Sequence, residues 1–330
     1  MKALVTGATG FLGGALAHRL HERGDQVTVF GRSPGALAAL EQAGMRALRG
    51  DLADTAAVRA ACHGQEVVFH VGALSSAWGQ AEAFYRANVL GTRSVAAGCE
   101  AERVRRLVYV STPSIYFRYA SRLNVPEDAP LPRKPANEYA RTKLLAEAEL
   151  DRAHARGLPV ISIRPRAIFG IGDQAILPRL VARLRAGSLR VIGDGQNITD
   201  LTYVENVVDA LLLCAQAPVT LMGKTYNITN GQPLPLWGLI RQLCAALDLA
   251  YPRRQVAYPV ALALASLLEA AARLRPGQPE PLLTRYMVGV LARSTTLDIT
   301  AARRELGYVP RIPVEEGFER FVAWWRKEQR

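Results

Sequence analysis

Cysteine, aromatic residues and long apolar runs are scarce in this 330-residue chain. The four cysteines lie far apart, without a C-x-x-C pair or neighbouring histidines at ligand spacing, which argues against a disulfide framework and against a zinc site. We therefore expect no bound metal, and four buried thiols in a reducing compartment. The uncharged stretch Val256 to Leu268 is too short to span a bilayer, which takes roughly 20 residues.

The start of the chain lacks the basic segment, apolar core and cleavage site of a signal peptide. Export is not expected, and we predict a cytoplasmic protein. The chain also lacks a basic run interleaved with aromatic side chains, so the formal net charge of +12 does not predict a nucleic-acid partner. Its scattered arginines indicate a solvated basic surface, which favours an anionic cofactor or substrate.

The first half of the chain alternates short apolar runs with segments of helix length. Such runs, separated by amphipathic helices, predict an α/β protein with a doubly wound parallel sheet covered on both faces. A later run, Thr225–Ile228, is expected to rejoin this sheet. The first six predicted strands are Ala3–Thr6, Val27–Phe30, Met45–Leu48, Val67–Val71, Leu107–Ser111 and Val160–Arg164.

After Arg164 the alternation weakens and connections rich in proline and glycine appear. We assign residues 1–165 and 200–229 to the domain that contains the sheet. Residues 166–199 and 230–330 are predicted to form a smaller, mostly helical domain. This second domain is expected to cap the carboxyl ends of the strands, where ligands bind in such sheets.

A glycine-rich turn with the spacing G-x-x-G-x-x-G follows the first strand directly and opens a helix that runs to about Arg23. The glycines permit a tight turn, close approach of a pyrophosphate and close packing of helix on strand, while the helix N-terminus faces the phosphates. A structural turn is the alternative, but the flanking strand and helix favour a dinucleotide site in a Rossmann-type domain. The predicted cofactor contacts are Gly7, Thr9, Gly10, Phe11, Leu12 and Gly13.

The third and fourth predicted strands also end in residues suited to a cofactor. The Asp51 carboxylate can accept a hydrogen bond from an adenine amino group, and the small residues Gly72 and Ala73 leave room for the cofactor backbone. Each of these could equally be a helix cap or a loop residue. Their combination with an asparagine on the following helix favours a binding site made of Asp51, Leu52, Val71, Gly72, Ala73 and Asn88.

Tyr139 and Lys143 lie four residues apart, on one face of a predicted helix. The ammonium group is expected to lower the pKa of the phenol and make it a usable acid or base. A pair at this spacing is more often an ordinary pair on a helix surface. The fifth strand, however, ends in hydroxyl-bearing residues around Thr112, one of which could polarise a substrate oxygen.

The glycine turn, the hydroxyl at a strand end and Tyr-x-x-x-Lys, in this order, resemble the extended short-chain dehydrogenases/reductases of the NAD-dependent epimerase/dehydratase superfamily over essentially the full chain. The resemblance implies that Thr112, or else Ser111 or Ser114, supplies the catalytic hydroxyl. It implies that Tyr139 is the proton donor and acceptor and that Lys143 holds the nicotinamide ribose. It further implies a homodimer and cofactor contacts at Pro165, Ala167 and Ile168.

Two departures argue against a nucleotide-sugar epimerase or dehydratase. Such enzymes typically carry Arg-x-Phe-Asn after the sixth strand and an arginine just before Asp-x-x-His/Tyr-Val, whereas this chain has Ala167 and Thr199 there. The segments 281–286 and 298–308 instead resemble the branch of 3β-hydroxysteroid dehydrogenases and 2-alkyl-3-oxoalkanoate reductases. That branch implies a large apolar ketone or alcohol as substrate. The predicted substrate contacts are Trp78, Ser114, Ile115, Tyr116 and, for a carboxylate, Arg166.

The segment VTVFGRSP, Val27 to Pro34, lacks the acidic residue that grips the adenosine ribose in NAD-preferring relatives. Gly31 occupies that position and leaves room for a 2′-phosphate, while Arg32 and Ser33 can bind it. A solvated loop arginine is the alternative. We predict a preference for NADP(H), with NAD(H) possible.

Three further alternatives remain open. A nucleotide-sugar enzyme would hold its cofactor tightly, and a non-catalytic NADP(H) sensor would bind it without turnover. The stretch Val256 to Leu268 is interpreted as a buried or lid helix of the capping domain, in preference to a membrane-surface patch.

Overall fold

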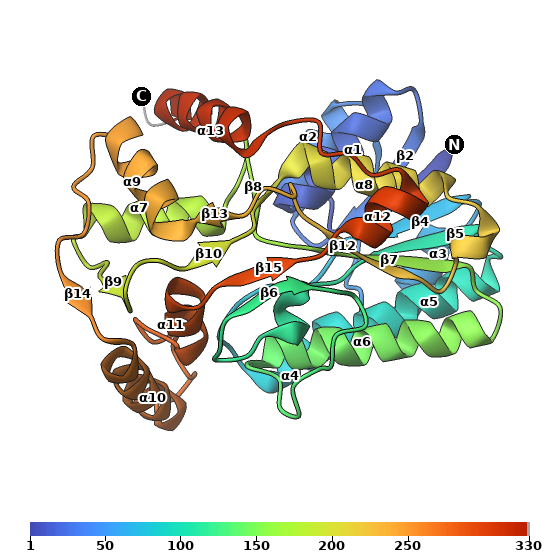
Figure 1. Cartoon of the computed structure of the whole chain (residues 1–330). Helices are drawn as coiled ribbons and strands as arrows, with labels where there is room; N and C mark the ends of the chain where they lie inside the picture. The colour runs from blue at the N-terminus through green and yellow to red at the C-terminus, as the bar shows by residue number, and fades with distance from the viewer. Residues whose placement is uncertain (329–330) are drawn as a thin grey trace.

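The computed structural model describes residues 1–328 and contains a seven-stranded parallel sheet (Figure 1). Its strand order is β12-β7-β5-β4-β1-β2-β3. The doubly wound sheet is therefore confirmed, and each predicted strand matches one of the seven to within about one residue at either end. The strands are β1 (Lys2–Thr6), β2 (Gln26–Gly31), β3 (Arg46–Arg49), β4 (Val67–His70), β5 (Arg106–Val110), β7 (Val160–Pro165) and β12 (Thr225–Ile228).

Helices cover both faces of this sheet, because its strands are apolar on both sides. One face packs against α1 (Phe11–Glu22), α2 (Pro34–Gln42) and α8 (Val204–Gln216). The other packs against α3 (Thr55–Cys62), α5 (Gly91–Ala101) and α6 (Glu138–Ala155). All four cysteines are free and buried, as predicted.

The strand order reverses beside β1, which has β2 on one side and β4 on the other. A crevice for ligands opens outside the carboxyl ends of the strands at such a point. The loops after β1 and β4, which carry Gly7 and Gly72, therefore meet where the cofactor was expected. Next along the chain are α4 (Ala81–Phe84) and a π-helix, η1 (Tyr85–Leu90), while a 3-10 turn, η2 (Pro113–Tyr116), follows β5.

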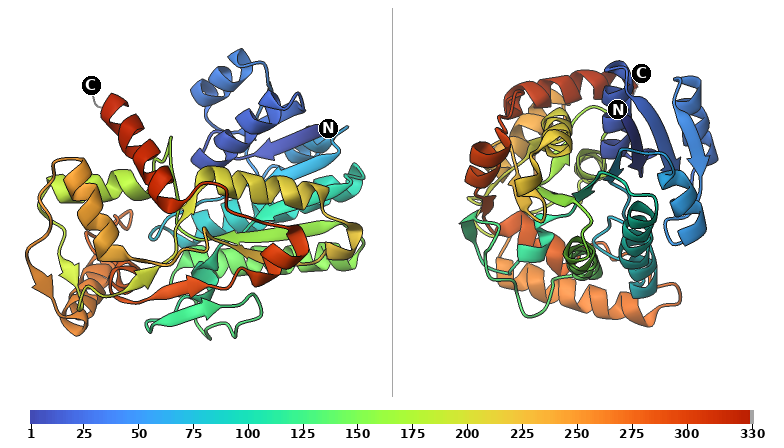
Figure 2. Two further views of the ribbon diagram at one scale, coloured as in Figure 1. Left: turned by 45° about the horizontal axis from the view of Figure 1, so that its top comes forward. Right: turned by 90° about the vertical axis from the view of Figure 1, so that its right-hand side faces the viewer.

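A second lobe stands beyond the carboxyl ends of these strands, at the left of Figure 1 and of the left-hand view in Figure 2. Its helices are α7 (Ile176–Arg185), α9 (Leu236–Ala246), α10 (Tyr258–Leu274) and α11 (Arg285–Ala292). A small sheet of order β13-β10-β15-β6 runs from it toward the main sheet. These strands are β6 (Arg122–Val125), β10 (Ile198–Thr199), β13 (Leu234–Pro235) and β15 (Thr295–Leu297); two-stranded pairs join β8 (Ile168–Phe169) to β11 (Thr202–Tyr203) and β9 (Val191–Ile192) to β14 (Gln255–Val256).

The domain boundary differs from the sequence-based assignment in two places. Strand β6 belongs to the small sheet although it lies within 1–165, because it pairs with β15. Helix α12 (Thr300–Leu306) packs against β12 and α8 although it lies within 230–330. Each segment crosses the boundary between the lobes because it contacts residues that are distant in the sequence. No local sequence pattern indicates such contacts. A short 3-10 turn, η3 (Val219–Leu221), precedes β12.

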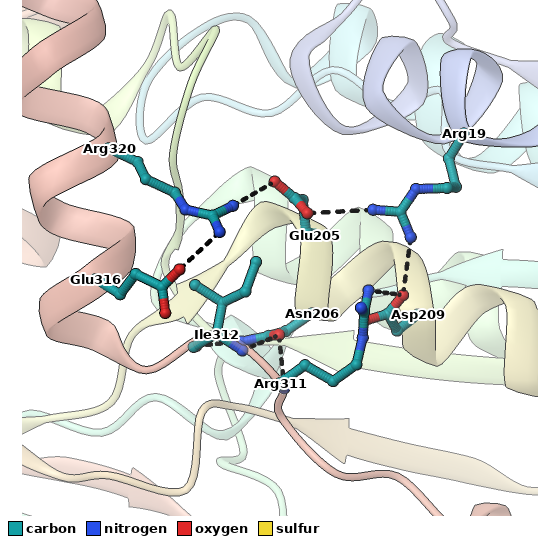
Figure 3. A network of polar contacts seen from close by, with 8 residues as sticks. All are labelled: Arg19, Glu205, Asn206, Asp209, Arg311, Ile312, Glu316 and Arg320. Atoms are coloured by element: carbon teal, nitrogen blue, oxygen red, sulfur yellow. Dashed lines mark hydrogen bonds and ion pairs between the residues drawn. The ribbon is translucent and has the colours of Figure 1, made fainter. Parts of the chain in front are cut away.

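Helix α8 is tied to its neighbours by a polar network (Figure 3). The Arg19 guanidinium of α1 donates to Glu205 and Asp209 of α8. From the other side, the terminal helix α13 (Val314–Glu328) contributes Arg320, which donates to Glu205 and to Glu316. The buried amide of Asn206 also caps the incoming backbone of residues 311 and 312. The network fixes the C-terminal segment against the cofactor domain.

Helix α10 corrects the interpretation of the uncharged stretch as a buried helix. It begins at Tyr258, after the short strand β14, and only one side of it is buried, through Ala261 and Ala265 against Val288. The other side is open to solvent, because no further element packs on it in the right-hand view of Figure 2. Among residues 1–328, every helix is too short or too polar to cross a bilayer.

Candidate active site

The turn after β1 has the backbone geometry that a pyrophosphate needs. Gly7 has φ +71°, and a Cβ placed there would lie 2.5 Å from Gly72 Cα. A Cβ on Gly13 would lie 2.3 Å from the Gly7 carbonyl oxygen, so helix and turn are in direct contact. Gly10 begins α1, and no side chain among residues 1–328 caps it. The N–H groups of the first turn are therefore open to an anion, which fits a dinucleotide.

The end of β2 accommodates no side chain at the position of the missing acid. A Cβ on Gly31 would lie 2.9 Å from Thr9 Cγ2, so the Thr9 side chain fills that space. Arg32 and Ser33 follow and are exposed. The register also places Arg49, the last residue of β3, directly opposite Gly31. Sequence reasoning did not consider Arg49, because only strand pairing places this residue opposite Gly31.

The loop after β4 rests on a buried histidine. Thr6 Oγ1 and Thr92 Oγ1 lie 2.8 and 2.9 Å from the two ring nitrogens of His70. Burial, with the nearby Lys143 charge, lowers the pKa of His70 to about 3, so the ring is neutral. Thr6 Oγ1 also accepts the Gly72 N–H at 3.2 Å. The neutral ring thus links β1 to the glycine that faces Gly7.

Asn88 clamps the same loop. Its Oδ1 accepts the Leu74 N–H at 2.7 Å, and its Nδ2 donates to the Leu74 carbonyl and to Thr142 Oγ1. Both amide hydrogens are thus used to hold the loop, and the predicted contact of Asn88 with a cofactor stays a prediction. Asp51 accepts the Ala53 N–H within its own loop and faces Arg86 at 3.5 Å. Its predicted contact with adenine stays a prediction.

Tyr139 lies in the first turn of α6, where the Asn137 cap accepts the Ala140 N–H at 2.8 Å. Burial raises the pKa of Tyr139, and the neighbouring Thr112 and Ser75 hydroxyls oppose that rise only in part. The expectation of a lowered pKa is therefore wrong for this state of the protein. Ser75 was also missed by sequence reasoning, because it comes from the loop after β4.

Lys143 lies one turn further along α6 and is buried. Its Nζ donates to the Val110 carbonyl at 2.6 Å and lies 4.1 Å from the centre of the Tyr109 ring. Burial lowers the pKa of Lys143 to about 7, although the Glu147 carboxylate opposes this effect. Desolvation by the surrounding core, which the spacing cannot indicate, is the physical reason.

A chain of hydroxyls leads from Thr112 into the second lobe. Thr112 Oγ1 donates to Ser114 Oγ at 3.1 Å, and Ser114 Oγ lies 2.9 Å from the Tyr286 hydroxyl of α11. The Tyr286 ring packs on Phe117, with 4.8 Å between ring centres. Tyr286 thus joins the site from a helix nearly 150 residues after Tyr139 in the chain. The predicted hydroxyls are brought together, with one tyrosine that was not predicted.

Two predicted substrate contacts are core residues. Ile115 is buried in a small cluster with Val125 and Leu297. The Tyr116 hydroxyl hydrogen-bonds to Arg164, Asn227 and a backbone carbonyl. Their side chains turn inward because η2 follows β5 immediately and packs against the small sheet. That they contact the substrate stays a prediction.

Two further predicted substrate contacts, Trp78 and Arg166, lie at the edge of the second lobe. Trp78 donates its indole N–H to the Gln278 carbonyl at 2.9 Å. Arg166 is buried, and its Nη2 lies 3.5 Å from Thr199 Oγ1. Its charge also lowers the pKa of Asp200 against the larger, raising effect of burial. Its Nε has no hydrogen-bond partner among residues 1–328. Pro165, Ala167 and Ile168 lie beside it, and Ala167 has the positive φ of 44°.

The fold and the arrangement of these residues indicate the class of enzyme to which the protein belongs. The profile of the NAD dependent epimerase/dehydratase family matches residues 3–229, and the chain belongs to that family. The protein is an NAD(P)-dependent oxidoreductase that interconverts a ketone and an alcohol.

Among known proteins, the chain is 40% identical to a 2-alkyl-3-oxoalkanoate reductase from Stenotrophomonas maltophilia (strain K279a), over 98% of this chain and 99% of that protein. It is 31% identical to the mouse sterol-4-alpha-carboxylate 3-dehydrogenase, decarboxylating, over 97% and 90% of the two chains. A solved structure of MoeE5 in complex with UDP-glucose and NAD superposes with a TM-score of 0.79, at 26% identity and over 100% of both chains.

Proposed function

We propose that this protein uses NADPH to reduce an apolar ketone, of the 2-alkyl-3-oxoalkanoate or sterol type, to its secondary alcohol. The observation that carries this proposal is the proximity of Thr112 and Ser75 to the Tyr139 phenol, one helical turn from Lys143. Ser75 and Thr112 follow β4 and β5, at the carboxyl edge of the sheet whose strand order reverses beside β1, and this location supports the proposal.

When bound, the dihydronicotinamide ring supplies the hydride that adds to the carbonyl carbon. Tyr139 hydrogen-bonds to the carbonyl oxygen and transfers its proton to that oxygen, so the product is a neutral alcohol. Because burial raises its pKa, Tyr139 is protonated at neutral pH and ready to donate in the direction of reduction. Thr112 orients the phenol, and Lys143, with a pKa near 7, can return a proton to the tyrosinate.

The substrate class is supported by the similarity to the oxoalkanoate reductase, which extends over nearly the whole length of both proteins. The absence from the sequence of both sugar-nucleotide residues, at Ala167 and Thr199, argues in the same direction. Arg166 is the candidate for the carboxylate of a β-keto acid. Its unpartnered Nε leaves one donor for that group, while Asp200 compensates part of its charge.

Loss of NADPH absorbance tests the proposal, with long-chain 2-alkyl-3-oxoalkanoates, a 3-oxosteroid, a simple aldehyde and UDP-glucose offered in turn. We expect turnover with the first two, and a decrease in kcat of about a hundredfold or more for Tyr139→Phe. Tyr258→Phe is the matched control, because its hydroxyl donates to the backbone carbonyl of Tyr119, in the loop between η2 and β6. Reduction by Tyr139→Phe at the wild-type rate contradicts the proposal.

A further inference from the structure

Helix α10 exposes a continuous apolar stripe, which we call the outer face of α10. Its large side chains are 61% (Val260), 50% (Leu264), 70% (Leu267) and 88% (Leu274) exposed. At 3.6 residues per turn they fall on one side of the helix, together with the exposed alanines at 263, 270 and 271. The other exposed large apolar residues of the described chain are spread over separate elements. The outer face is therefore a patch in need of a partner.

Positive charge lies at both ends of the outer face. Arg253 and Arg254 precede the helix and are exposed, and Arg273 and Arg275 lie exposed at its end. The one acid of the helix, Glu269, is turned inward: its Oε1 accepts the Arg285 N–H at 2.7 Å, and its side chain is only 13% exposed. Glu269 Oε2 also pairs with Arg273 at 3.9 Å, so the charges left for a partner are those of Arg253, Arg254 and Arg275. An apolar strip bounded by these guanidinium groups is complementary to acyl chains beneath anionic headgroups.

The same charges argue against a second copy of this chain as the partner. A twofold axis pairs two such helices either antiparallel or parallel, and in both arrangements the arginines at an end of one helix would meet arginines of the other. No acid on the outer face could compensate them. The outer face also lacks the tyrosine and tryptophan residues that anchor most protein interfaces.

The helix that carries the outer face is connected to the active-site residues through α11. Helix α10 packs on α11, which carries Tyr286 into the hydroxyl chain. The segment between the two helices contacts Trp78 through the Gln278 carbonyl, and Arg273, in the last turn of α10, holds its guanidinium 5.5 Å from the indole centre. A substrate that leaves a bilayer beneath α10 would meet this segment first.

We propose that the outer face of α10 docks the protein on an anionic lipid surface, with the helix parallel to the bilayer. The outer face is separate from the reacting groups, so the docking itself does not depend on the proposed reaction. Only the idea that docking supplies substrate rests on the proposed apolar ketone, which would partition into the same lipid.

Co-sedimentation of the full chain with vesicles tests the proposal. The vesicles are phosphatidylcholine alone, or phosphatidylcholine mixed with phosphatidylglycerol. The double variant Leu264→Asp/Leu267→Asp places two charges on the outer face, at positions exposed enough to leave the fold intact. The matched control, Val219→Asp/Val309→Asp, changes two residues that are equally exposed (73% and 68%) but lie elsewhere.

We expect wild type and control to sediment with the mixed vesicles and to dissociate as salt rises. The partition of the α10 variant should fall at least tenfold. Equal sedimentation of the two double variants, or none by the wild type, overturns the proposal. So does a wild-type dimer that the α10 variant alone converts to monomer, since the outer face would then be an interface between copies. Vesicle binding is measured without cofactor or ketone, so its failure is distinct from that of the proposed reaction.

Discussion

Replacing Arg32 by alanine should weaken the binding of NADPH more than that of NADH, because the two cofactors differ only in the 2′-phosphate. Arg32 is exposed at the end of β2, beside the Thr9 side chain that fills the space over Gly31. A hydrogen bond to a charged group contributes about 1.5–3 kcal/mol, and screening at an exposed site reduces this to about 1–2 kcal/mol. The dissociation constant for NADPH should therefore rise about 5- to 30-fold.

NADH supplies the reference in this experiment, because it offers Arg32 no phosphate. Its affinity should change less than about twofold, and the difference between the cofactors should shrink as salt is added. Arg49→Ala should also weaken NADPH binding more than NADH binding, but to a smaller extent, since Arg49 pairs with Gly31. Arg46→Ala is the control, because it lies at the opposite end of the same strand, beside Thr28.

Isothermal titration of the four proteins with both cofactors measures these constants. An equal loss of affinity for NADPH and NADH would place Arg32 in the general fold of the loop, not in recognition of the phosphate. Unchanged NADPH affinity would refute its role altogether.

Three further predictions concern Glu147 and Lys143 of α6 and Tyr286 of α11. Glu147→Gln leaves Arg164, which it binds at 2.6 Å, without its charge partner, and should lower the free energy of urea unfolding by about 3 kcal/mol. Burial lowers the pKa of Lys143 from 10.5 to about 7, so above pH 7 the unfolded chain binds the extra proton. The free energy of unfolding should consequently rise with pH, relative to Lys143→Met, by at most about 1.4 kcal/mol per pH unit; parallel curves would contradict this. Tyr286→Phe should lower kcat about three- to tenfold with little change in KM, whereas Tyr258→Phe should not.

Local patterns were sufficient for the frame of the protein. The run Thr225–Ile228 is strand β12 with the same ends, and the helix after the glycine turn, predicted to run to about Arg23, ends at Glu22. Such elements can be predicted from neighbouring residues, through the alternation of apolar runs with helix-length segments, through glycine spacing and through apolar periodicity. The same holds for Tyr139 and Lys143, whose shared helix face follows from four residues of separation alone.

Burial was decided by the tertiary structure. Ile115 and Tyr116 follow the predicted catalytic hydroxyl of Thr112 in sequence, yet their side chains point into the core. The Tyr116 hydroxyl hydrogen-bonds there to Arg164 and Asn227, which come from distant strands. The direction of the pKa shift of Tyr139 was likewise misjudged, since desolvation depends on what surrounds the phenol. An apolar composition also could not tell which side of α10 is covered.

The assembly of the site shows the same division. Thr112, Tyr139 and the glycine turn are recognisable in the chain because each is a local motif of a strand end or a helix. Ser75 and Tyr286 were not predicted as site residues, because Ser75 approaches Tyr139 from the loop after β4 and Tyr286 reaches Ser114 through the packing of α11 against the loop after β5. Periodicity and spacing act over a few residues, whereas charge proximity and desolvation act through space, so only the folded chain determines them.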